Sequence, residues 1–349
     1  MIEGVRIINK DVLTGLLDLE DASVQTCVTS PPYWGLRDYG TGEWKGGDPE
    51  CSHVRDTKKS EHTKTGQVFP SGDAIYKTEC PRCGATRKDL QLGLEETPEE
   101  YIDNMVKVFR GIKRVLKDDG TLWVNIGDTY CGTGHKGDTK DPKFGERRNA
   151  QSVALNKKID GIKAKDMVGI PWMLAFALRS DGWYLRQDII WNKPNAMPEP
   201  VKDRCTKAHE YIFLLSKSRK YYFNHEALKE PATYAGDKRG DRPDKRRGTS
   251  MNSINSNTGK FRNKRSVWNI NLKPYKEAHF AVFPPELPEF CILAGSKEGD
   301  IVLDPFWGSG TTGAVARKHS RKAIGIELNS KYVEMSMQRF QQQHLNFGG

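Results

Sequence analysis

The stretch DIVLDPFWGSGTTG at residues 300–313 decides which fold the sequence predicts. It is typical of a short apolar strand, a glycine-rich turn with GxGxxG spacing, and the start of a helix that extends to about Lys318. A second strand, Lys322 to Glu327, follows and ends on an acidic residue. The backbone of such a turn can approach a nucleotide-like ligand closely, and the acid can accept hydrogen bonds from ribose hydroxyls. The stretch therefore predicts an α/β sheet that binds a nucleoside.

The strands that complete this sheet must come from the N-terminal part of the chain. About 20 residues follow Glu327, which suffices for one helix (330 to about 341) but not for a second half-domain. Near the start of the chain, residues 5–9 and 23–28 have strand character, and Asp11 is placed to cap the helix between them. A strand, a helix and a strand with short connections form a βαβ unit of a parallel sheet.

The second strand of that unit leads into Thr29-Ser30-Pro31-Pro32-Tyr33-Trp34. Each proline lacks an N–H group and has a fixed φ angle, so the chain must leave the sheet there in an extended turn. The turn presents a hydroxyl, backbone carbonyls and an aromatic ring. Ligands of open parallel sheets bind at the carboxyl ends of the strands, so we expect this turn and Asp11 to lie beside the glycine-rich turn and Glu327. Taken alone, the stretch is equally compatible with a plain proline-rich turn.

The middle of the chain carries the remaining predicted elements. Thr97 is placed to cap the clearest helix, with Pro98 at its first position and Glu100 placed for a capping box. Apolar residues recur along one face of that helix as far as Leu116, and Gly120 ends it. The other predicted elements are a strand at 121–126, a helix at 171–178 and strands at 183–191 and 210–215.

The composition of the 349 residues is that of a soluble globular protein. Charged residues make up 29% and hydrophobic residues 36%, which argues against a disordered chain. The formal net charge of +10 favours an anionic partner, a merely basic protein being the alternative. No apolar run approaches the roughly 20 residues that span a membrane, and the N-terminus does not resemble a signal peptide. Seven cysteines, with four metal-ligand candidates grouped together, predict reduced thiols and a cytoplasmic location.

Residues 48–89 contain a candidate metal site. Cys80 and Cys83 form a CxxCG knuckle, in which two thiolates can face one ion while the glycine permits the tight turn. Cys51 and His53 complete a set of three cysteines and one histidine, as expected for structural zinc. The segment is too poor in apolar residues to order itself by burial, which favours a bound metal. The alternative is two unrelated thiol pairs in a loop.

The excess of positive charge is concentrated in residues 216–265. They contain fourteen Lys and Arg against five Asp and Glu, interleaved with aromatic residues. A basic segment with aromatic side chains suits a module that follows a phosphate backbone and contacts bases, whereas the alternative is a disordered basic linker. Residues 136–165 hold nine Lys and Arg against four Asp and Glu, which fits a solvated loop and a nucleic-acid-binding segment equally well.

Two motifs together resemble those of the amino-DNA methyltransferases of the permuted β class: Ser30-Pro31-Pro32-Tyr33 and the later Asp304-Pro305-Phe306-Trp307-Gly308-Ser309-Gly310. In that family the catalytic motif precedes the S-adenosylmethionine motif, as it does here. The resemblance covers about residues 1–40, 90–215 and 266–349. It implies a Rossmann-like α/β fold with a circularly permuted motif order. It also implies S-adenosylmethionine as methyl donor, double-stranded DNA as partner and a target base flipped out of the duplex.

The resemblance also implies roles for individual residues. Glu327 is expected to hold the ribose, and Asp11 to lie near the adenine. Phe283 and Pro284 stand where the family has a Lys-Pro pair, so the lysine contact is absent, and Trp307 replaces a small residue. The residues implied to surround the methionine part of the cofactor are Asp304, Phe306, Gly308, Gly310, Thr311 and Thr312, and Pro305 is also implied to bind the cofactor.

For catalysis, the resemblance and the chemistry of the substrate both indicate the Ser30–Tyr33 turn. An exocyclic amine of cytosine or adenine is a poor nucleophile because its lone pair is delocalised into the ring. We expect Ser30 Oγ and the Pro31 carbonyl to hold the amine hydrogens. Pro31 and Pro32 keep that carbonyl rigid, and Tyr33 stacks on the flipped base. A serine at the first position resembles the cytosine-N4 subgroup, so N4-methylation of cytosine is predicted.

Three alternatives stay open: adenine-N6 methylation, a nucleic-acid-binding protein without catalysis, and a nicotinamide-dependent dehydrogenase. The intact motif residues argue against the second, and the missing half-domain after Glu327 argues against the third. Besides DNA, a second copy of the chain and a cognate restriction enzyme are candidate partners. The expected organisation is a catalytic core at 1–47, 90–215 and 266–349, a zinc-binding insertion at 48–89 and a target-recognition insertion at 216–265.

Overall fold

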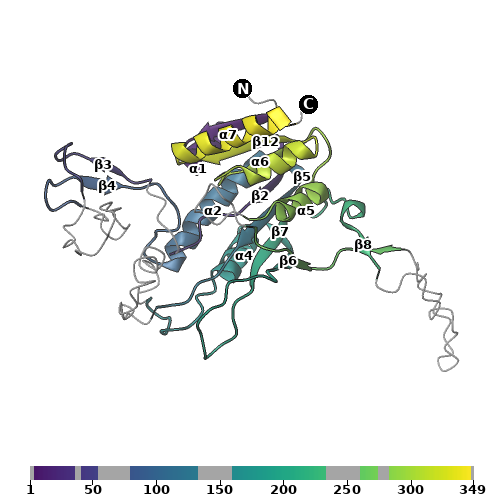
Figure 1. Ribbon diagram of the computed structural model, residues 1–349, viewed down its shortest axis with the longest axis horizontal. Helices are drawn as coiled ribbons and strands as arrows, with labels where there is room; N and C mark the ends of the chain where they lie inside the picture. The colour runs from purple at the N-terminus through teal and green to yellow at the C-terminus, as the bar shows by residue number, and fades with distance from the viewer. Residues whose placement is uncertain are drawn as a thin grey trace.

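The computed structural model describes residues 4–35, 41–53, 79–132, 159–232, 260–273 and 283–346, with side chains to residue 341. Its centre is an eight-stranded sheet in the order β1-β12-β11-β2-β5-β7-β6-β10 (Figure 1). The strands are β1 (Val5–Asn9), β2 (Val24–Thr29), β5 (Leu116–Ile126), β6 (Tyr184–Asn192), β7 (His209–Ser216), β10 (Val267–Asn269), β11 (Ile301–Asp304) and β12 (Lys322–Glu327). The prediction of an α/β sheet is confirmed.

The sheet joins the two ends of the sequence. β1 and β11 both pair with β12 in parallel, and β11 also pairs with β2, so N-terminal strands flank the C-terminal ones. β2 pairs in parallel with β5, whereas β7 runs antiparallel to both β5 and β6. As a result, the carboxyl ends of β1, β2, β5, β6, β11 and β12 lie at one edge of the sheet, together with the start of β7.

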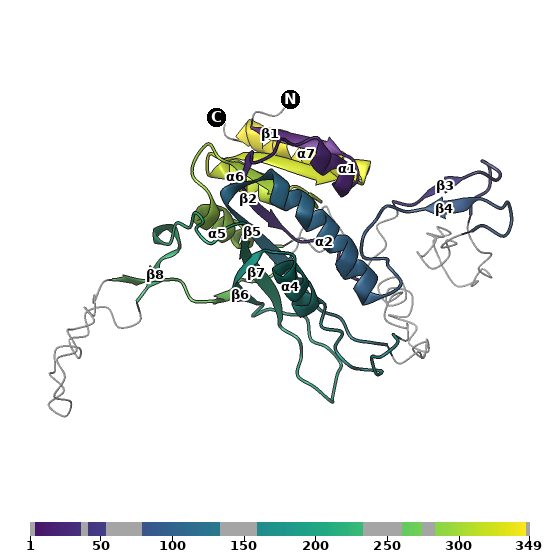
Figure 2. The same cartoon turned by 180° about the vertical axis from the view of Figure 1, so that it is seen from behind.

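Helices cover both faces of the sheet (Figures 1 and 2). They are α1 (Val12–Leu17), α2 (Pro98–Val115) and α4 (Ile170–Ser180) on one face, and α5 (Glu286–Gly295), α6 (Thr311–Lys318) and α7 (Ser330–Asn346) on the other. Each group of helices shares a core cluster with one face of the sheet, so the central strand β2 is buried at every residue. Within the described residues, no helix has the length and apolar character needed to cross a membrane.

Two helices begin at the capping residues that the sequence pattern predicted. Thr97 Oγ1 accepts a hydrogen bond from the Glu100 backbone N–H at 3.2 Å, at the first turn of α2. Asp11 caps α1 by accepting from two backbone N–H groups of its first turn, both at 3.1 Å. A side-chain oxygen in each case satisfies N–H groups that have no partner within the helix. Both predicted helix starts are confirmed.

Two strands of the main sheet differ from the prediction, and α2 ends at Val115 rather than at Gly120. β5 begins at Leu116, directly after α2. The polar residues before Gly120 are already extended, and Asp118 and Asp119 face solvent at the end of the sheet. The pairing of β2 with β5 shifts register there, between Val24 and Thr26. β10 was not predicted, because three residues are too short to show an alternating pattern.

Two small antiparallel pairs lie outside the main sheet on opposite sides of the molecule (Figures 1 and 2). They are β3 (Glu43–Lys45) with β4 (Thr86–Lys88), and β8 (Glu230–Pro231) with β9 (Phe261–Arg262). The first pair belongs to the cysteine-containing insertion and starts before residue 48, and the second belongs to the basic segment. The domain boundaries stay predictions, and residues 54–78, 133–158 and 233–259 lie outside the described part of the chain.

Candidate active site

The strand ends at the carboxyl edge bring the two sequence motifs into contact. Thr29, the last residue of β2, donates a hydrogen bond from Oγ1 to Asp304 Oδ1 at 2.7 Å, across 275 positions of sequence. Thr312, in the first turn of α6, donates to Asp304 Oδ2 at 2.6 Å, and the Phe306 N–H donates to Oδ1 at 3.1 Å. Asp304 therefore links the proline turn, the glycine-rich turn and α6.

The Asp304 carboxyl group is removed from solvent, since the residue is only 2% exposed. Burial disfavours the charged form and raises the pKa of Asp304 to about 7. The hydrogen bonds from Thr312, Thr29 and Phe306 act in the opposite direction, and the nearby Glu327 carboxylate adds to the increase. Asp304 thus changes protonation near neutral pH rather than near the ordinary value of 3.8.

Glu327, at the end of β12, holds the glycine-rich turn. Its Oε2 accepts a hydrogen bond from the Gly308 N–H at 2.7 Å, and its Oε1 accepts from the Asn329 N–H at 2.9 Å. Burial raises the pKa of Glu327, although these backbone bonds oppose the increase. Gly308 has a φ of 50°, which glycine adopts without strain, and a Cβ there would meet no atom within 4 Å. The turn therefore presents bare backbone to open space.

Trp307, which departs from the family pattern, packs behind this turn and is 2% exposed. Its Nε1 donates to Ser336 Oγ at 3.1 Å, and its ring stacks on Phe340 with centroids 5.9 Å apart. Cβ atoms on Gly313 and Gly325 would approach the indole to 2.0 and 2.2 Å, so these two glycines leave the room that the ring needs. The larger side chain is thus accommodated in the core, where it joins the turn to α7.

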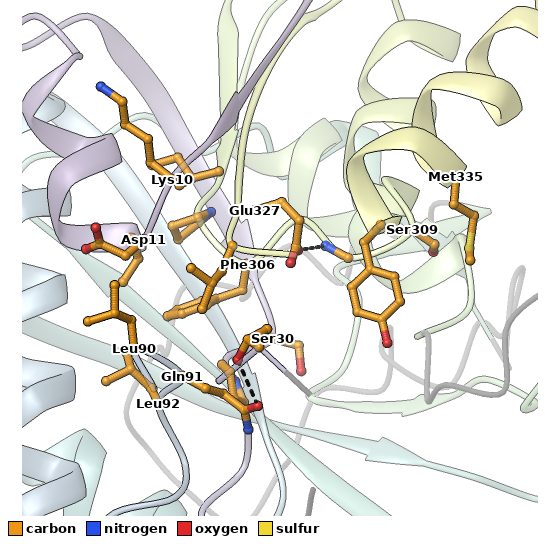
Figure 3. Close-up of a pocket in the computed structure, with 18 residues that line it drawn as sticks. Lys10, Asp11, Ser30, Leu90, Gln91, Leu92, Phe306, Ser309, Glu327 and Met335 are labelled. Atoms are coloured by element: carbon orange, nitrogen blue, oxygen red, sulfur yellow. Dashed lines mark hydrogen bonds between the residues drawn. The ribbon is translucent and has the colours of Figure 1, made fainter. Parts of the chain in front are cut away.

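A pocket lies between the two turns, α1, α7 and the segment that follows β4 (Figure 3). Its apolar walls include Leu90, Leu92, Phe306 and Ile326, and the Glu327 carboxylate lies at one side. Apolar walls beside a single acid and a bare glycine turn suit a nucleoside, which offers a flat ring, ribose hydroxyls and a polar tail. The pocket is therefore a candidate for the predicted cofactor site.

The structure brings together most, but not all, of the predicted site residues. Those that line the pocket are Asp11, Ser30, Pro32, Pro305, Phe306, Gly308 and Glu327. Asp304, Gly310, Thr311 and Thr312 lie in or directly behind the glycine-rich turn, and Pro31 is buried beside Ser30. Phe283 and Pro284 do not line this pocket: they precede α5, and Phe283 packs against the second core cluster. Their contact with a cofactor stays a prediction.

Tyr33 is held by a polar network at the ends of β5 and β7. Its hydroxyl donates to Glu210 Oε2 at 2.7 Å, lies 3.2 Å from Asn125 Oδ1, and accepts from Ser30 Oγ at 3.4 Å. Asn125 Nδ2 also donates to Glu210 Oε2, at 3.0 Å, and Lys193 forms an ion pair with Glu210 Oε1. Burial, followed by the Glu210 carboxylate, raises the pKa of Tyr33 well above its ordinary value. The phenol is therefore neutral and donates.

Sequence reasoning missed the partners of both motifs. Thr29 was quoted in the proline turn without a role, and Asn125, Lys193 and Glu210 were not singled out. Asn125 lies near the end of β5 and Glu210 near the start of β7, both at the carboxyl edge of the sheet. A polar residue next to an apolar strand segment is the signal that could have found them. Lys193 follows β6 in a loop, where the sequence carries no comparable signal.

The four predicted metal ligands also come together, away from the pocket. Cys51 Sγ lies 3.8 Å from Cys80 Sγ, and Cys83 Sγ lies 3.5 Å from His53 Nδ1. All four donor atoms lie within 4.8 Å of one another. Three thiols and an imidazole at this spacing form a donor set that can hold one metal ion, as structural zinc requires.

A sheet covered on both faces, with a nucleoside-type pocket beside a Ser-Pro-Pro-Tyr turn, defines the class of Rossmann-like methyltransferases. A family model described as DNA methylase matches residues 24–338, and the chain belongs to this family of N6 and N4 amino-methyltransferases. The Type II methyltransferase M.Cfr9I of Citrobacter freundii is 41% identical over 99% of this chain and 90% of its own length. M.SmaI of Serratia marcescens is 41% identical over 97% and 91%. The predicted family, of the restriction–modification type, is confirmed.

Solved structures agree with the fold. PvuII DNA methyltransferase, a cytosine-N4-specific enzyme by its name, has a TM-score of 0.57 at 18% identity, covering 97% of this chain and 87% of its own. TTHA0409 of Thermus thermophilus, solved in complex with S-adenosyl-L-methionine, has a TM-score of 0.52 at 21% identity, covering 97% and 95%. The predicted methyltransferase fold is confirmed, whereas a circular permutation stays a prediction.

The raised pKa of Asp304 predicts a pH-dependent stability. The carboxyl titrates near 3.8 in the unfolded chain and near 7 in the folded protein, so the folded state binds more protons between these values. Its contribution to the free energy of unfolding is therefore full below the lower pKa and falls as the pH rises to about 7. We expect Asp304→Asn to lack this loss of stability. The free energy of unfolding of the variant should therefore rise relative to that of the wild type by about 2–3 kcal/mol between about pH 5 and pH 7.

Urea unfolding of both proteins at the two pH values measures this difference. Parallel changes in the wild type and the variant would contradict the raised pKa. If the wild type became more stable relative to the variant as the pH rises, the pKa of Asp304 would be lowered by folding rather than raised.

Proposed function

We propose that this DNA amino-methyltransferase transfers the methyl group of S-adenosylmethionine to the N4 amine of a cytosine flipped out of duplex DNA. The observation that carries the proposal is the Thr29–Asp304 hydrogen bond of 2.7 Å, which fixes the Ser30 turn beside the glycine-rich turn. A methyl donor in the pocket and an amine at Ser30 would then be neighbours. Serine at the first position of the catalytic turn favours cytosine over adenine.

The residues of the pocket fit S-adenosylmethionine. Phe306, Ile326 and Leu90 offer apolar surface to an adenine ring, and Glu327 can accept hydrogen bonds from ribose hydroxyls. The bare backbone at Gly308 leaves room for the methionine end. When bound, this cofactor supplies an electrophilic methyl group on its sulfonium. The Thermus structure, a complex with the same molecule, supports the choice.

The Ser30 turn would act by holding the target amine rather than by removing a proton from it first. Ser30 lines the pocket, and the Tyr101 hydroxyl donates to the Pro32 carbonyl at 2.9 Å, so the turn is braced from the side of α2. Acceptors at Ser30 Oγ and the Pro31 carbonyl would bind the amine hydrogens and draw the nitrogen toward tetrahedral geometry. Its lone pair would then point at the methyl group, and alignment would replace a strong base.

The network at Tyr33 offers a route for the proton that the amine must lose after methyl transfer. The methylated nitrogen carries one proton too many, which can pass to Ser30 Oγ as the serine proton moves to the Tyr33 oxygen. The Tyr33 proton would move to Glu210 Oε2, along bonds of 3.4 and 2.7 Å. Glu210 ends neutral beside Lys193, and every other group regains its starting state. The route assigns Glu210 as the final proton acceptor.

The partners follow from the same proposal. Duplex DNA is the substrate, and the basic segment at 216–265 is the proposed target-recognition region. Relatives named as Type II methyltransferases support a cognate restriction enzyme that reads the same sequence. A homodimer and a cytoplasmic location stay predictions.

Product analysis tests the proposed reaction. The protein is incubated with S-adenosylmethionine and duplex DNA of varied sequence, and the DNA is digested to nucleosides and analysed by mass spectrometry. We expect N4-methylcytosine. N6-methyladenine instead would keep the mechanism and overturn the choice of base, which the family leaves open. No methylated nucleoside, despite cofactor binding in a titration, would favour a binding protein without catalysis.

Substitutions of Tyr33 separate its ring from its hydroxyl. Tyr33→Phe keeps the ring for stacking but breaks the proton route, so we expect kcat to fall about 10-fold with KM for DNA nearly unchanged. Tyr33→Ala also removes the stacking surface, so kcat/KM should fall about 100-fold or more. The affinity for S-adenosylmethionine should stay the same in both variants.

Steady-state kinetics and cofactor titration measure these effects. Tyr184→Phe is the matched control, because Tyr184 lies at the opposite end of β6 from the site. Full activity of Tyr33→Ala would exclude the stacking role. Full activity of Tyr33→Phe would exclude the proton route but would leave the stacking role untouched.

A further inference from the structure

The β3–β4 hairpin has two ends that belong to two different sites. At one end, beyond Lys45 and before Thr86, lie the four candidate metal ligands. At the other end, Thr41 and residues 90–92 line the cofactor pocket. Only three residue pairs separate the two ends, which is about 10 Å of strand. A change at the metal end therefore lies close to the wall of the pocket.

The metal end has the dimensions of a zinc site. Two sulfurs bound tetrahedrally at about 2.3 Å from one ion lie about 3.8 Å apart. Cys51 Sγ and Cys80 Sγ are separated by 3.8 Å, and Cys83 Sγ lies 3.5 Å from His53 Nδ1. Trp44 of β3 stacks on the His53 ring at 4.3 Å, so a strand residue orients one of the ligands. Cys80 is fully buried, and its N–H donates to the Ala85 carbonyl at 2.8 Å.

Within the described residues, the pairing of the two strands of the hairpin is short and exposed. Each strand has three residues, and most side chains of residues 41–53 are exposed. A two-stranded hairpin of this length is marginal in water, and it must also close the long segment between Lys45 and Thr86. An ion bound at the ligands closes that segment at its base. Metal-binding free energy would then contribute directly to the stability of the hairpin.

The pocket end is connected to the hairpin by a polar cluster. Thr41 Oγ1 donates to Asp89 Oδ1 at 2.8 Å, and the Gln91 N–H donates to the same oxygen at 3.0 Å. Arg87 of β4 pairs with Asp89 Oδ2 at 2.9 Å, with both side chains mostly buried. Gln91 and Leu92 line the same pocket as Ser30 (Figure 3). Gly93 continues the contact, because its carbonyl accepts from the Gly35 N–H at 2.8 Å, just after the proline turn.

We propose that a zinc ion held by Cys51, His53, Cys80 and Cys83 maintains the wall of the cofactor pocket formed by Thr41 and residues 90–92. The ion keeps β3 and β4 paired, and the paired strands hold Asp89 against Thr41 and Gln91. Zinc is thus a structural metal coupled to cofactor binding, without a part in the chemistry. The identity of the cofactor rests on the proposed function, whereas the coupling of metal to pocket does not.

The test uses the full-length protein with and without its metal. The zinc content is measured after purification and after removal with a chelator, and zinc is then added back. Hydrogen–deuterium exchange follows the peptide 86–95, and a titration measures the affinity for S-adenosylmethionine. Without zinc we expect fast exchange in this peptide, unchanged exchange in β5, and about 10-fold weaker cofactor binding. Added zinc should restore both.

A pair of variants gives the same comparison without a chelator. Cys80→Ser removes a buried ligand and should lose zinc, protection of 86–95 and cofactor affinity together. Cys205→Ser is the matched control, because Cys205 is an exposed free cysteine outside the cluster, and this variant should keep all three.

The outcomes distinguish the inference from the proposed function. Absence of zinc from the purified protein and no uptake of added zinc would overturn the inference. Zinc that can be removed without changing exchange at 86–95 would overturn the coupling. Zinc-dependent exchange in a protein that does not bind S-adenosylmethionine would support the inference and contradict the proposed function.

Discussion

One buried carboxyl group connects the sheet to the site. Asp304 ends β11 in a place where water cannot solvate it, and an unpartnered polar group there would cost free energy. Its partners are the hydroxyls of Thr29 and Thr312 and the Phe306 N–H, so they come from three separate elements. The bonds that satisfy this group also fix the Ser30–Tyr33 turn against the glycine-rich turn. In the proposed reaction, folding and the placing of the methyl donor beside the target amine therefore depend on the same interaction.

Much of the fold could be predicted because its signals are local. The caps at Asp11 and Thr97 lie within one turn of the helices they start. The strand that ends on Glu327 is a short apolar run with a charged residue at each end, which can be recognised in the sequence alone. The placing of N-terminal strands beside the two strands of the glycine-rich motif was predicted, whereas the full order of the eight strands was not. β10 and the early start of β5 could not be predicted, because pairing with a neighbouring strand decides them.

The site was predictable where a motif is continuous and not where it depends on contacts between distant segments. Ser30, Gly308 and Glu327 line one pocket, as the two motifs indicated. Glu210 reaches Tyr33 from a different strand, and the polar cluster at Asp89 belongs to an insertion that the family resemblance does not cover. The spacing of residues along the sequence does not indicate these contacts. The Glu210 contact depends on the strand order of the main sheet, and the Asp89 cluster depends on the pairing of β3 with β4.

The central claim is that the hydroxyl of Thr29 holds the Ser30–Tyr33 turn and the glycine-rich turn together. The most direct measurement is the affinity for S-adenosylmethionine of Thr29→Val, compared with Thr26→Val. Thr26 lies on the same strand and is also buried, but its hydroxyl pairs with Thr121 at 2.9 Å, away from the pocket. The account predicts that Thr29→Val weakens cofactor binding about 10-fold while Thr26→Val leaves it unchanged. Equal affinities of the two variants would contradict it.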